Sequence, residues 1–472
     1  MKNIYLYGSG NRCKILLNIL ADTDYMISGI VDSDETRWGM HINGIIISSP
    51  EEIRCDADND YVCVTFYSPY VYEKIWDTLA ESYGVAYEKQ LTFHDILYDV
   101  YKMKFRNWNT FVSSGTHKIF FDASWGLGLG GVEAWLEDII EKLDRTNNDN
   151  FFLLSKKNQN DVLPNVEKHI LEFYYEDTSI FSLDYIEKGM KFLTEHAPCT
   201  MVFSRVNELM LAACLVKNKY PHKFKIIMVD HGSCDGMYRD ILSYQDEIDK
   251  YVCVSSGIKK RLIEYGIDSK KISSMTVPIQ YEKVFLRDYS LDRRKTLKLG
   301  YAGRLEIFEK RLDILLDLIE ELEKRKIKYV LNIAGNGSFR DKIKYFISSR
   351  KLENRIILRG LLPRNLMSDF WEEQDIAINV SDNEGRPISN MEAMVYGAVP
   401  VVTDTVGIRD DVENGINGYI VPINDYHSMA DKIEYLDKHR EILPVFGKKA
   451  QTDMRKKMNI DDYMKFWLRI IK

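Results

Sequence analysis

Long apolar runs are missing from this sequence of 472 residues. No stretch of about 18 apolar residues occurs, so no segment is expected to span a membrane as a helix. The amino terminus reaches Gly8 too early for the apolar core of a signal peptide. These absences predict a cytoplasmic protein. The lysines and arginines between Lys217 and Lys271 leave two interpretations open, a peripheral contact at the inner face of the membrane and an ordinary solvated surface.

Paired cysteines are missing as well. The seven cysteines are scattered and odd in number, and the spacing Cys-x-x-Cys does not occur. This usage is typical of reduced thiols and argues against a disulfide framework or a zinc site. Excess positive charge is also missing, since the formal net charge of −7 argues against a dedicated nucleic-acid binder. No Asp-x-Asp motif follows a predicted strand of the second or third domain, so neither a metal ion nor another cofactor is predicted.

What is present is the composition of a globular protein, 45% hydrophobic and 29% charged, without internal repeats or low-complexity tracts. A chain of this length is too long for one core and suggests three domains. Short apolar runs alternate with helical patterns, which predicts an α/β fold with parallel sheets. We place the domains at residues 1–112, 115–288 and 292–455, followed by a helix at 456–472 that crosses back onto the middle domain.

The first domain opens with the pattern of a nucleotide-binding βαβ unit. A predicted strand at 4–7 leads to Gly8-Ser9-Gly10, a helix, and a second strand that ends at Asp32. Glycines there let the backbone approach a phosphate, and the acid is placed for a ribose. Cys13 occupies the third glycine position of Gly-x-Gly-x-x-Gly, so the NAD fingerprint is incomplete. A domain that serves packing or association is the alternative.

The second domain carries a glycine-rich turn between a predicted strand and a predicted helix. Gly128, Gly130 and Gly131 lie within four residues of one another, which suggests backbone N–H groups close to an anion, although tight packing would also require glycine. Later strands end in polar residues, Arg205 and His231 among them. Because His231 follows a strand and precedes a glycine, we expect it at the functional edge of the sheet; a structural or surface histidine is the alternative.

The third domain offers cations and glycines after its first two strands. Gly303 and Arg304 end one strand, and Lys310 follows six residues later. An arginine fork and a lysine point charge suit a diphosphate, but they could also be solvated surface cations. Gly335 and Gly337 form a tight turn after the next strand.

Two carboxylates follow in the segment 381–397 of the same domain. Glu384 lies on the loop after an apolar strand, and Glu392 lies eight residues later near the start of a helix. Ligands bind at this edge of open α/β sheets, and a helix amino terminus there attracts phosphate. The alternative is a capping box in 389–392, in which Glu392 only completes the helix start, with Glu384 a solvated loop acid.

On these motifs, residues 118–472 resemble the retaining glycosyltransferases of family 4, which have the GT-B fold of two facing Rossmann-like domains. The motifs that carry the resemblance are Gly-Gly-Val-Glu (130–133), Asp-His-Gly (230–232), Tyr-Val-Cys-Val-Ser-Ser-Gly (251–257), Gly-Arg-Leu (303–305) with Lys310, Ile-Ala-Gly-Asn-Gly (333–337) and the Glu-x7-Glu of Glu384 and Glu392.

The resemblance implies roles for these residues. The donor diphosphate would be held by Arg304 and Lys310, the nucleotide ribose by Glu392 and the donor sugar by Glu384, while His231 and the glycine loop would line the reaction centre. The donor-site set also includes Gly130, Gly131, Gly303, Gly335 and Gly337. Arg386 departs from the family, which usually has an apolar residue there, and this leaves the choice of sugar open.

The implied activity is sugar transfer from a nucleoside-diphosphate sugar, with a UDP-sugar as the first choice, to a glycan or lipid-linked acceptor in the synthesis of a capsule or other cell-surface polysaccharide. Retention in this family proceeds by front-face attack without a protein nucleophile. Two alternatives come from other classes. One is a glycosyltransferase-like subunit that binds sugar or a partner without chemistry, since a fold alone does not imply catalysis. The other is a sugar-nucleotide oxidoreductase that uses the first domain.

The first domain has a resemblance of its own. Its layout is similar to the small Rossmann-like domain of the sugar O-acyltransferases that modify sialic acid and bacillosamine, a module that helps to hold a nucleotide-linked or free sugar. The left-handed helix repeat of those enzymes does not follow, so acyl transfer is not expected.

Overall fold

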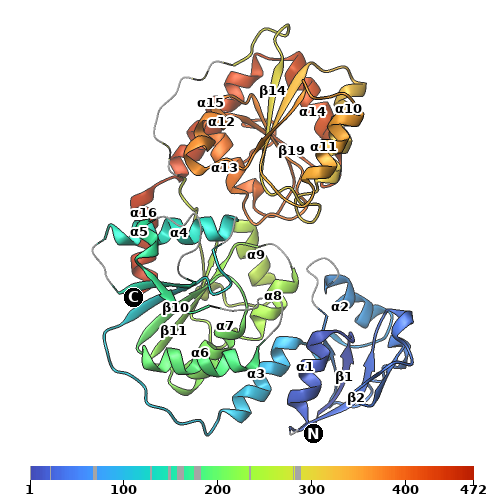
Figure 1. Ribbon diagram of the computed structural model, residues 1–472, viewed down its shortest axis with the longest axis vertical. Helices are drawn as coiled ribbons and strands as arrows, with labels where there is room; N and C mark the ends of the chain where they lie inside the picture. The colour runs from blue at the N-terminus through green and yellow to red at the C-terminus, as the bar shows by residue number, and fades with distance from the viewer. Residues whose placement is uncertain are drawn as a thin grey trace.

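The computed structural model describes residues 2–472 except 22, 67–71, 128–129, 147–149, 157–163, 175–181, 233–234, 280, 282–286 and 288. The described chain builds three α/β units, each around its own sheet (Figure 1). In the view of Figure 1 the third unit lies above the second, and the first lies beside the second.

The first sheet has six strands in the order β3-β4-β2-β1-β5-β6, parallel except for the β3–β4 hairpin. Its elements are β1 (Lys2–Tyr7), α1 (Asn11–Leu20), β2 (Tyr25–Val31), β3 (His41–Ile42), β4 (Ile45–Ser48), β5 (Asp60–Val64), α2 (Tyr72–Glu81), β6 (Gln90–Thr92) and α3 (Phe93–Lys104).

The second sheet has seven parallel strands in the order β13-β12-β11-β10-β7-β8-β9. Its strands are β7 (Lys118–Asp122), β8 (Phe151–Ser155), β9 (Ile170–Glu172), β10 (Cys199–Phe203), β11 (Phe224–Asp230), β12 (Lys250–Cys253) and β13 (Ile272–Ser274). Its helices are α4 (Gly131–Asp144), α5 (Pro164–Glu167), α6 (Leu183–Glu195), α7 (Glu208–Lys219), α8 (Asp235–Leu242) and α9 (Ser256–Glu264).

The third sheet has six parallel strands in the order β16-β15-β14-β17-β18-β19. Its strands are β14 (Leu297–Ala302), β15 (Tyr329–Ala334), β16 (Ile356–Gly360), β17 (Ile376–Asn379), β18 (Val399–Thr403) and β19 (Tyr419–Val421). The helices of this part of the chain are α10 (Leu312–Lys324), α11 (Arg340–Ser349), α12 (Met367–Glu372), α13 (Ile388–Val395), α14 (Tyr426–Lys438), α15 (Ile442–Lys457) and α16 (Ile460–Ile470).

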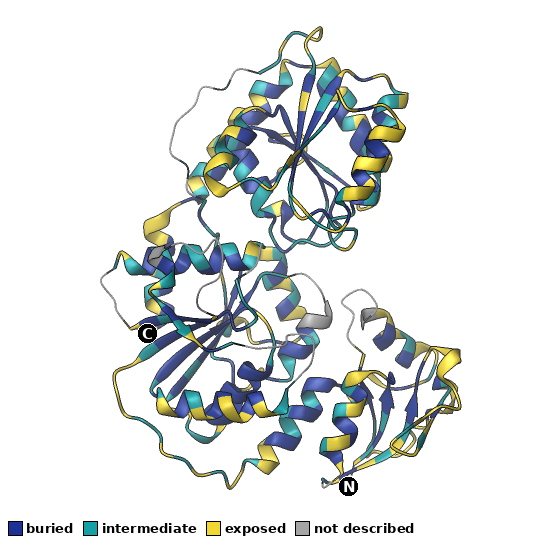
Figure 2. Ribbon diagram, viewed as in Figure 1, coloured by how far each residue is buried: buried dark blue, intermediate teal, exposed yellow. Residues whose placement is uncertain are grey.

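Continuous apolar strands explain why the sheets are parallel. Every residue of β10, β17 and β18 is buried, as expected when helices cover both faces of a sheet (Figure 2). The apolar residues of helix α10 recur at helical spacing, so they lie on one face of the helix. The buried residues of this face include Leu312, Leu315, Ile319 and Leu322. Because neighbouring strands run parallel, the loops that follow their carboxyl ends lie at one edge of each sheet.

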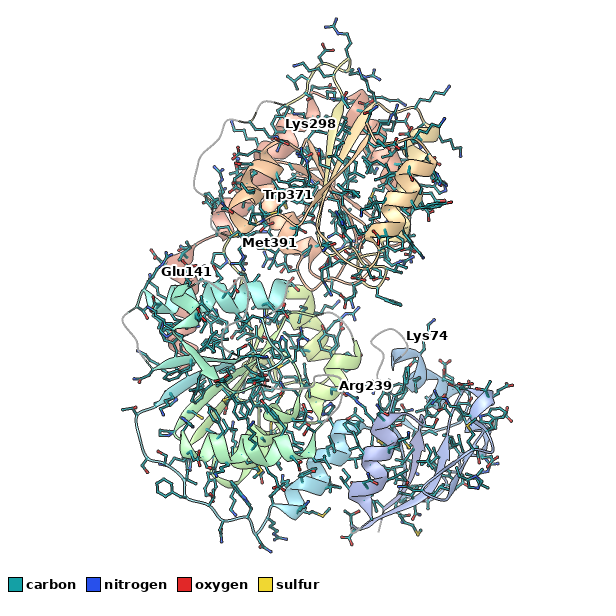
Figure 3. The ribbon with its side chains drawn as sticks, viewed as in Figure 1. Lys74, Glu141, Arg239, Lys298, Trp371 and Met391 are labelled. Carbon is teal, nitrogen blue, oxygen red and sulfur yellow. The ribbon has the colours of Figure 1, made fainter. Side chains whose placement is uncertain are left out.

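Helix α3 joins the first unit to the second. Its residues share a hydrophobic core with α7 and α8, and Tyr98 donates a hydrogen bond of 2.6 Å to Glu247. The Nδ1 of buried His94 lies 2.9 Å from the Tyr244 hydroxyl. Figure 3 labels Arg239 at the same boundary, where its guanidinium lies 4.4 Å from the centre of the Trp76 ring. The first unit is thus attached through a packed interface.

The last helix lies on the second unit rather than on the third. Tyr463 and Trp467 of α16 are buried in a core that includes Trp135 of α4. The Trp135 indole donates a hydrogen bond of 2.8 Å to the Tyr463 hydroxyl, and Figure 1 shows α16 beside α4 and α5. The chain therefore crosses from the second unit to the third and back again.

Several lysines of the basic stretch between Lys217 and Lys271 form hydrogen bonds with other parts of the protein. Four of its lysines donate hydrogen bonds to backbone carbonyls: Lys217, Lys219, Lys250 and Lys271. These ammonium groups stabilise loops and strand ends. Across the described ranges, no helix is both long enough and apolar enough to cross a membrane.

Candidate functional site

Lys310 and Glu384, 74 residues apart in the sequence, form an ion pair at the carboxyl edge of the third sheet. Only 18% of the lysine side chain and 13% of the glutamate side chain is exposed. Glu384 also accepts a hydrogen bond of 2.9 Å from the Ser381 hydroxyl. The loop is held at its base, since the Thr403 hydroxyl donates to the Ser381 carbonyl at 2.5 Å. The structure thus places one predicted cation and one predicted acid side by side in a shielded position.

Arg304 belongs to the same group of loops but has a different partner. Its guanidinium donates to Glu309 at 2.8 Å, and half of its side chain (52%) is exposed. The Glu309 carbonyl in turn accepts a hydrogen bond of 3.0 Å from the Asp382 backbone, which ties the loop after β14 to the loop that carries Glu384. Arg304 is therefore near the predicted site along the chain, while its charge is directed to a neighbouring acid.

The glycines after β14 and β15 allow two loops to pack closely. A Cβ atom on Gly335 would lie 1.9 Å from the Gly303 carbonyl oxygen, and one on Gly337 would lie 2.4 Å from the Leu305 carbonyl oxygen. Both glycines have a positive φ, at 144° and 159°, which side chains rarely adopt. Backbone packing within the protein is thus sufficient to require glycine at these two positions.

Glu392 does not cap a helix. Helix α13 begins at Ile388 after Pro387, which takes the N-cap position without a side-chain cap, so Ser389 already lies inside the helix. The capping-box alternative is wrong because the fixed φ of proline starts the helix earlier than the serine signal implied. Burial raises the pKa of Glu392 to about 7, although Trp371 and Arg364 act in the opposite direction.

This raised pKa predicts a pH-dependent stability. Between the ordinary pKa of 4.5 and about 7, the folded protein holds a proton on Glu392 that the unfolded chain has released. The contribution of Glu392 to the free energy of unfolding is therefore largest below pH 4.5 and decreases as the pH rises to 7. In urea denaturation at pH 5 and pH 7.5, Glu392→Gln should lose less stability across this interval than the wild type. Identical pH profiles for the two proteins would contradict the raised pKa.

On the second unit, Glu133 occupies the helix start that was expected to attract a ligand anion. Gly130 is the N-cap of α4, and a Cβ atom there would lie 2.3 Å from Glu133 Oε2. Glu133 Oε1 accepts hydrogen bonds from the Trp125 indole at 3.3 Å and from Arg205 at 3.1 Å. A carboxylate of the protein itself therefore lies over this helix amino terminus, and Gly128 is outside the described residues.

His231 follows β11 as expected and is a neutral imidazole. Burial, together with the charge of Arg205, lowers its pKa to about 3. Its Nε2 atom is buried without a hydrogen-bond partner among the residues that the structure describes, and its ring lies 4.8 Å from the ring of Trp135. The uncharged Nε2 atom of His231 can donate a hydrogen bond to a ligand hydroxyl or accept one from it, depending on the tautomer. It does not supply a positive charge.

Loops of the second and third units meet around these residues. A Cβ atom on Gly385, next to Glu384, would lie 2.1 Å from the His231 carbonyl oxygen. One on Gly131 would lie 3.6 Å from Ile388 at the start of α13. The structure thus joins Lys310 and Glu384 directly and brings the backbone of His231 against the same loop. Sequence reasoning missed two ion pairs, Arg205 with Glu133 and Arg386 with Asp411. It missed them because the partners in each pair are distant in the chain.

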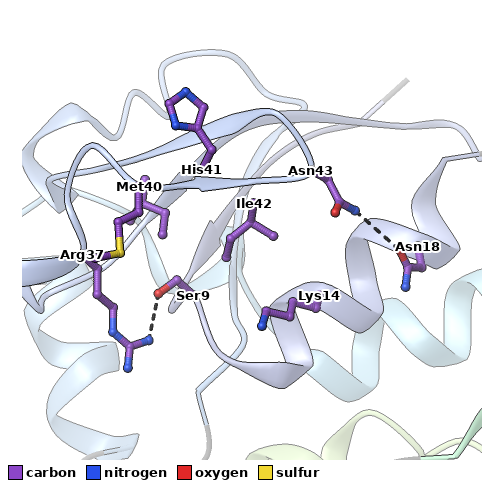
Figure 4. Close-up of a pocket in the computed structure, with 9 residues that line it drawn as sticks. Ser9, Lys14, Asn18, Arg37, Met40, His41, Ile42 and Asn43 are labelled. Atoms are coloured by element: carbon purple, nitrogen blue, oxygen red, sulfur yellow. Dashed lines mark hydrogen bonds between the residues drawn. The ribbon is translucent and has the colours of Figure 1, made fainter.

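The first unit has a pocket of about 560 Å³ beside α1 and the β3–β4 hairpin (Figure 4). Lys14, Arg37 and Met40 are among its lining residues. The acid that was expected to meet a ribose, Asp32, is buried and accepts hydrogen bonds from the backbone and hydroxyl of Ser9 at 2.8 and 2.5 Å. That carboxylate holds the loop after β1, and its contact with a ribose stays a prediction.

Among the described residues, no group of three or more His, Cys, Asp or Glu side chains is arranged to hold a metal ion. The cationic side chains near the edge of the third sheet include Lys310 and Arg304, which pair with Glu384 and Glu309.

Comparison with protein families gives two matches. Residues 286–453 match the family described as Glycosyl transferases group 1, and residues 1–90 match the family C2185-like, N-terminal. The first match covers the third unit with Lys310, Glu384 and Glu392. The second does not test the expected resemblance to sugar O-acyltransferases, which stays a prediction.

Two curated relatives extend the comparison. The chain is 30% identical over 175 residues to a poly(ribitol-phosphate) alpha-N-acetylglucosaminyltransferase of Staphylococcus aureus, covering 36% of this chain and 34% of that protein. It is 25% identical over 320 residues to the lipopolysaccharide 1,6-galactosyltransferase of Salmonella typhimurium, covering 64% and 84%. The chain thus spans about a third of the first relative and most of the second. Both relatives are glycosyltransferases of bacterial glycopolymers.

Solved structures identify the fold. The lipopolysaccharide outer core galactosyltransferase WaaB superimposes with a TM-score of 0.58 at 20% identity, over 74% of this chain and 100% of that one. HepE of Anabaena, solved with UDP and glucose, superimposes with a TM-score of 0.60 at 15% identity, over 75% of this chain and 98% of that one. The second and third units therefore have the GT-B fold, as the sequence motifs predicted, and the first unit is an addition to it.

Proposed function

We propose that this protein is a retaining glycosyltransferase that transfers a sugar from a UDP-sugar to a glycan or lipid-linked acceptor in the synthesis of a cell-surface polysaccharide. The observation that carries the proposal is the shielded Lys310–Glu384 pair at the sheet edge of the glycosyltransferase domain. The relatives, which act on lipopolysaccharide and poly(ribitol phosphate), support the choice of acceptor class. HepE, which binds UDP, supports the choice of donor.

In this mechanism the bond between the anomeric carbon and the donor phosphate breaks as the acceptor hydroxyl attacks from the same face. The hydroxyl proton passes to the departing phosphate oxygen, so no protein nucleophile is required. Negative charge grows on the diphosphate, and Lys310, Arg304 and the amino terminus of α13 stabilise it. Fixed cations of this kind replace the metal ion that other enzymes use.

The other residues bind and orient the donor. Glu384, held by Lys310 and Ser381, accepts hydrogen bonds from hydroxyls of the donor sugar. Glu392 accepts hydrogen bonds from the ribose, and neutral His231 contacts the sugar from the second unit. The glycines at 130, 131, 303, 335 and 337 let the loops approach one another and the diphosphate. The domain limits in this proposal are 1–112, 115–288, 292–455 and 456–472.

A panel of nucleotide sugars tests the proposal. We expect a UDP-sugar to raise the melting temperature, while GDP-, ADP-, CDP- and dTDP-sugars raise it less, with the same result in the presence of a chelator. A ligand at a hundred times its dissociation constant stabilises by about 2.7 kcal/mol. This corresponds to roughly 5 to 10 °C for a domain of ordinary size. Stabilisation without any release of UDP to water or to an acceptor would favour the non-catalytic subunit instead.

A further inference from the structure

Arg386 lies between Glu384 and helix α13, at the position where an apolar residue was expected. Its side chain is almost fully buried, at 5% exposure, and forms a two-pronged ion pair with Asp411, which is 2% exposed. Nε donates to Asp411 Oδ2 at 2.8 Å and Nη2 donates to Asp411 Oδ1 at 2.5 Å. These contacts fix the loop of Glu384 to another loop of the same unit.

The remaining nitrogen of Arg386 reaches the second unit. Nη1 donates to the Val254 carbonyl at 3.1 Å and to the Thr276 hydroxyl at 2.8 Å. Val254 follows β12 and Thr276 follows β13, so both lie at the carboxyl edge of the second sheet. One guanidinium therefore joins the donor side of the structure to the acceptor side.

Neighbouring contacts show that the two edges interlock. The Ser256 backbone N–H donates to Asp410 at 2.7 Å, one residue before the partner of Arg386. Across the boundary, a Cβ atom on Gly257 would lie 2.2 Å from the Val406 carbonyl oxygen; within the third unit, one on Gly407 would lie 1.7 Å from the Gly385 carbonyl oxygen. Loops this close leave no room for adjustment, so a side chain that bridges them determines how the two edges meet.

From these contacts we infer that Arg386 is a positioning residue for sugar transfer: it holds the loop of Glu384 and the start of α13 against His231 by joining Asp411 to Val254 and Thr276. The inference rests on the proposed donor role of Glu384 and Lys310. All three guanidinium nitrogens of Arg386 donate to groups of the protein itself, so the role that we assign to Arg386 is positioning and not donor binding. Lysine cannot replace it, since an ammonium group lacks the planar fork that binds Asp411 and the second unit together.

As a positioning residue, Arg386 should affect kcat and not the KM for the donor. Lys310, Glu384 and Glu392 belong to the third unit and provide most of the proposed donor contacts, whereas the second unit adds His231 and the glycine loop. Loss of the bridge should therefore leave the donor KM within about threefold. The donor side of the third unit and the acceptor side of the second unit would no longer be aligned for transfer. A misplacement of about 1 Å costs on the order of 10²-fold in kcat. An apolar residue at position 386 should therefore reduce kcat about 100-fold at a nearly constant donor KM.

The experiment compares Arg386→Leu, Arg386→Lys and Thr276→Val in steady-state UDP release from the UDP-sugar that stabilises the wild type. Thr276→Val removes a bridging hydrogen bond and leaves the buried pair with Asp411 intact, so it tests the bridge even if Arg386→Leu folds poorly. We expect an intermediate loss of kcat for Thr276→Val and for Arg386→Lys. The matched control is Arg409→Ala, which removes an exposed arginine of the neighbouring loop, paired with Asp404 and 67% exposed.

Small-angle scattering of the same variants provides a second measure. Arg386→Leu should give a larger radius of gyration than the wild type and Arg409→Ala, because the edges of the two units separate. Wild-type kcat in both Arg386→Leu and Thr276→Val would overturn the inference, and so would a raised donor KM at constant kcat, which would place Arg386 in the sugar site. A wild type that binds the UDP-sugar but never releases UDP would instead refute the proposed function, while the scattering would still test the bridge.

Discussion

Lys310→Ala is expected to abolish both donor-induced stabilisation and sugar transfer. The change removes a cation from the donor diphosphate and leaves the Glu384 carboxylate, only 13% exposed, without its partner. Removing one member of a shielded ion pair commonly lowers the free energy of unfolding by about 3–5 kcal/mol. The diphosphate also gains charge in the transition state, and loss of one preorganised group that stabilises such charge typically costs roughly 10²- to 10³-fold in kcat. The measurements are the melting shift with a UDP-sugar and the rate of UDP release.

Lys298→Ala is the matched control. Lys298 is an exposed lysine of β14, and Figure 3 places it at the end of the third unit opposite Met391, the neighbour of Glu392. It should keep the wild-type shift and rate. The double variant Lys310→Ala/Glu384→Gln separates the two effects of the lysine, since it removes the unpaired charge but not the need for a cation at the diphosphate. Recovery of transfer in the double variant would show that Lys310 serves only to neutralise Glu384.

Gly385→Ala is expected to stop transfer while the separate units stay folded. An added Cβ would lie 2.1 Å from the His231 carbonyl oxygen and 3.0 Å from Ile258, so the second and third units would have to move apart. Overpacking of this kind typically costs 1–3 kcal/mol of stability. The displaced loop carries Glu384, so we expect the transfer rate to fall by at least about 100-fold.

Gly10→Ala provides the control for this substitution. Nothing lies within 4 Å of a Cβ at Gly10, and its φ of −81° is open to alanine. Circular dichroism should show unchanged secondary structure in both variants, with a lower rate of UDP release in Gly385→Ala alone. A wild-type rate in Gly385→Ala would mean that the two edges do not approach this closely during turnover.

Several parts of the fold and the site were predictable because they depend on local patterns. Apolar strand runs followed by glycine and polar residues indicated where strands end, and parallel strands place those ends at one edge of a sheet. This is why Lys310 and Glu384 were expected at the same site before any coordinates. The helical spacing of α10 likewise indicated its buried face.

At three places the structure shows local contacts that the sequence patterns did not indicate. The capping box at Glu392 failed because Pro387 starts helix α13 earlier. At the glycine loop the carboxylate of Glu133 lies over its own helix start, and a ligand anion at this loop stays a prediction. Asp32 was expected at a ribose but is bound by Ser9. At the glycine loop and at Asp32 a nearby polar group of the protein forms the contact, and a sequence pattern does not indicate which group that will be.

By itself, then, the sequence determined the elements, the parallel sheets and the edge at which the chemistry lies. These features follow from backbone hydrogen bonding and apolar periodicity, which act over a few residues. Only the tertiary structure decided the partners of the charges. Arg304 pairs with Glu309, whereas Lys310 pairs with Glu384 and Arg386 pairs with Asp411. A buried charge requires a counter-charge at hydrogen-bond distance, and only the folded chain determines which distant residue comes that close.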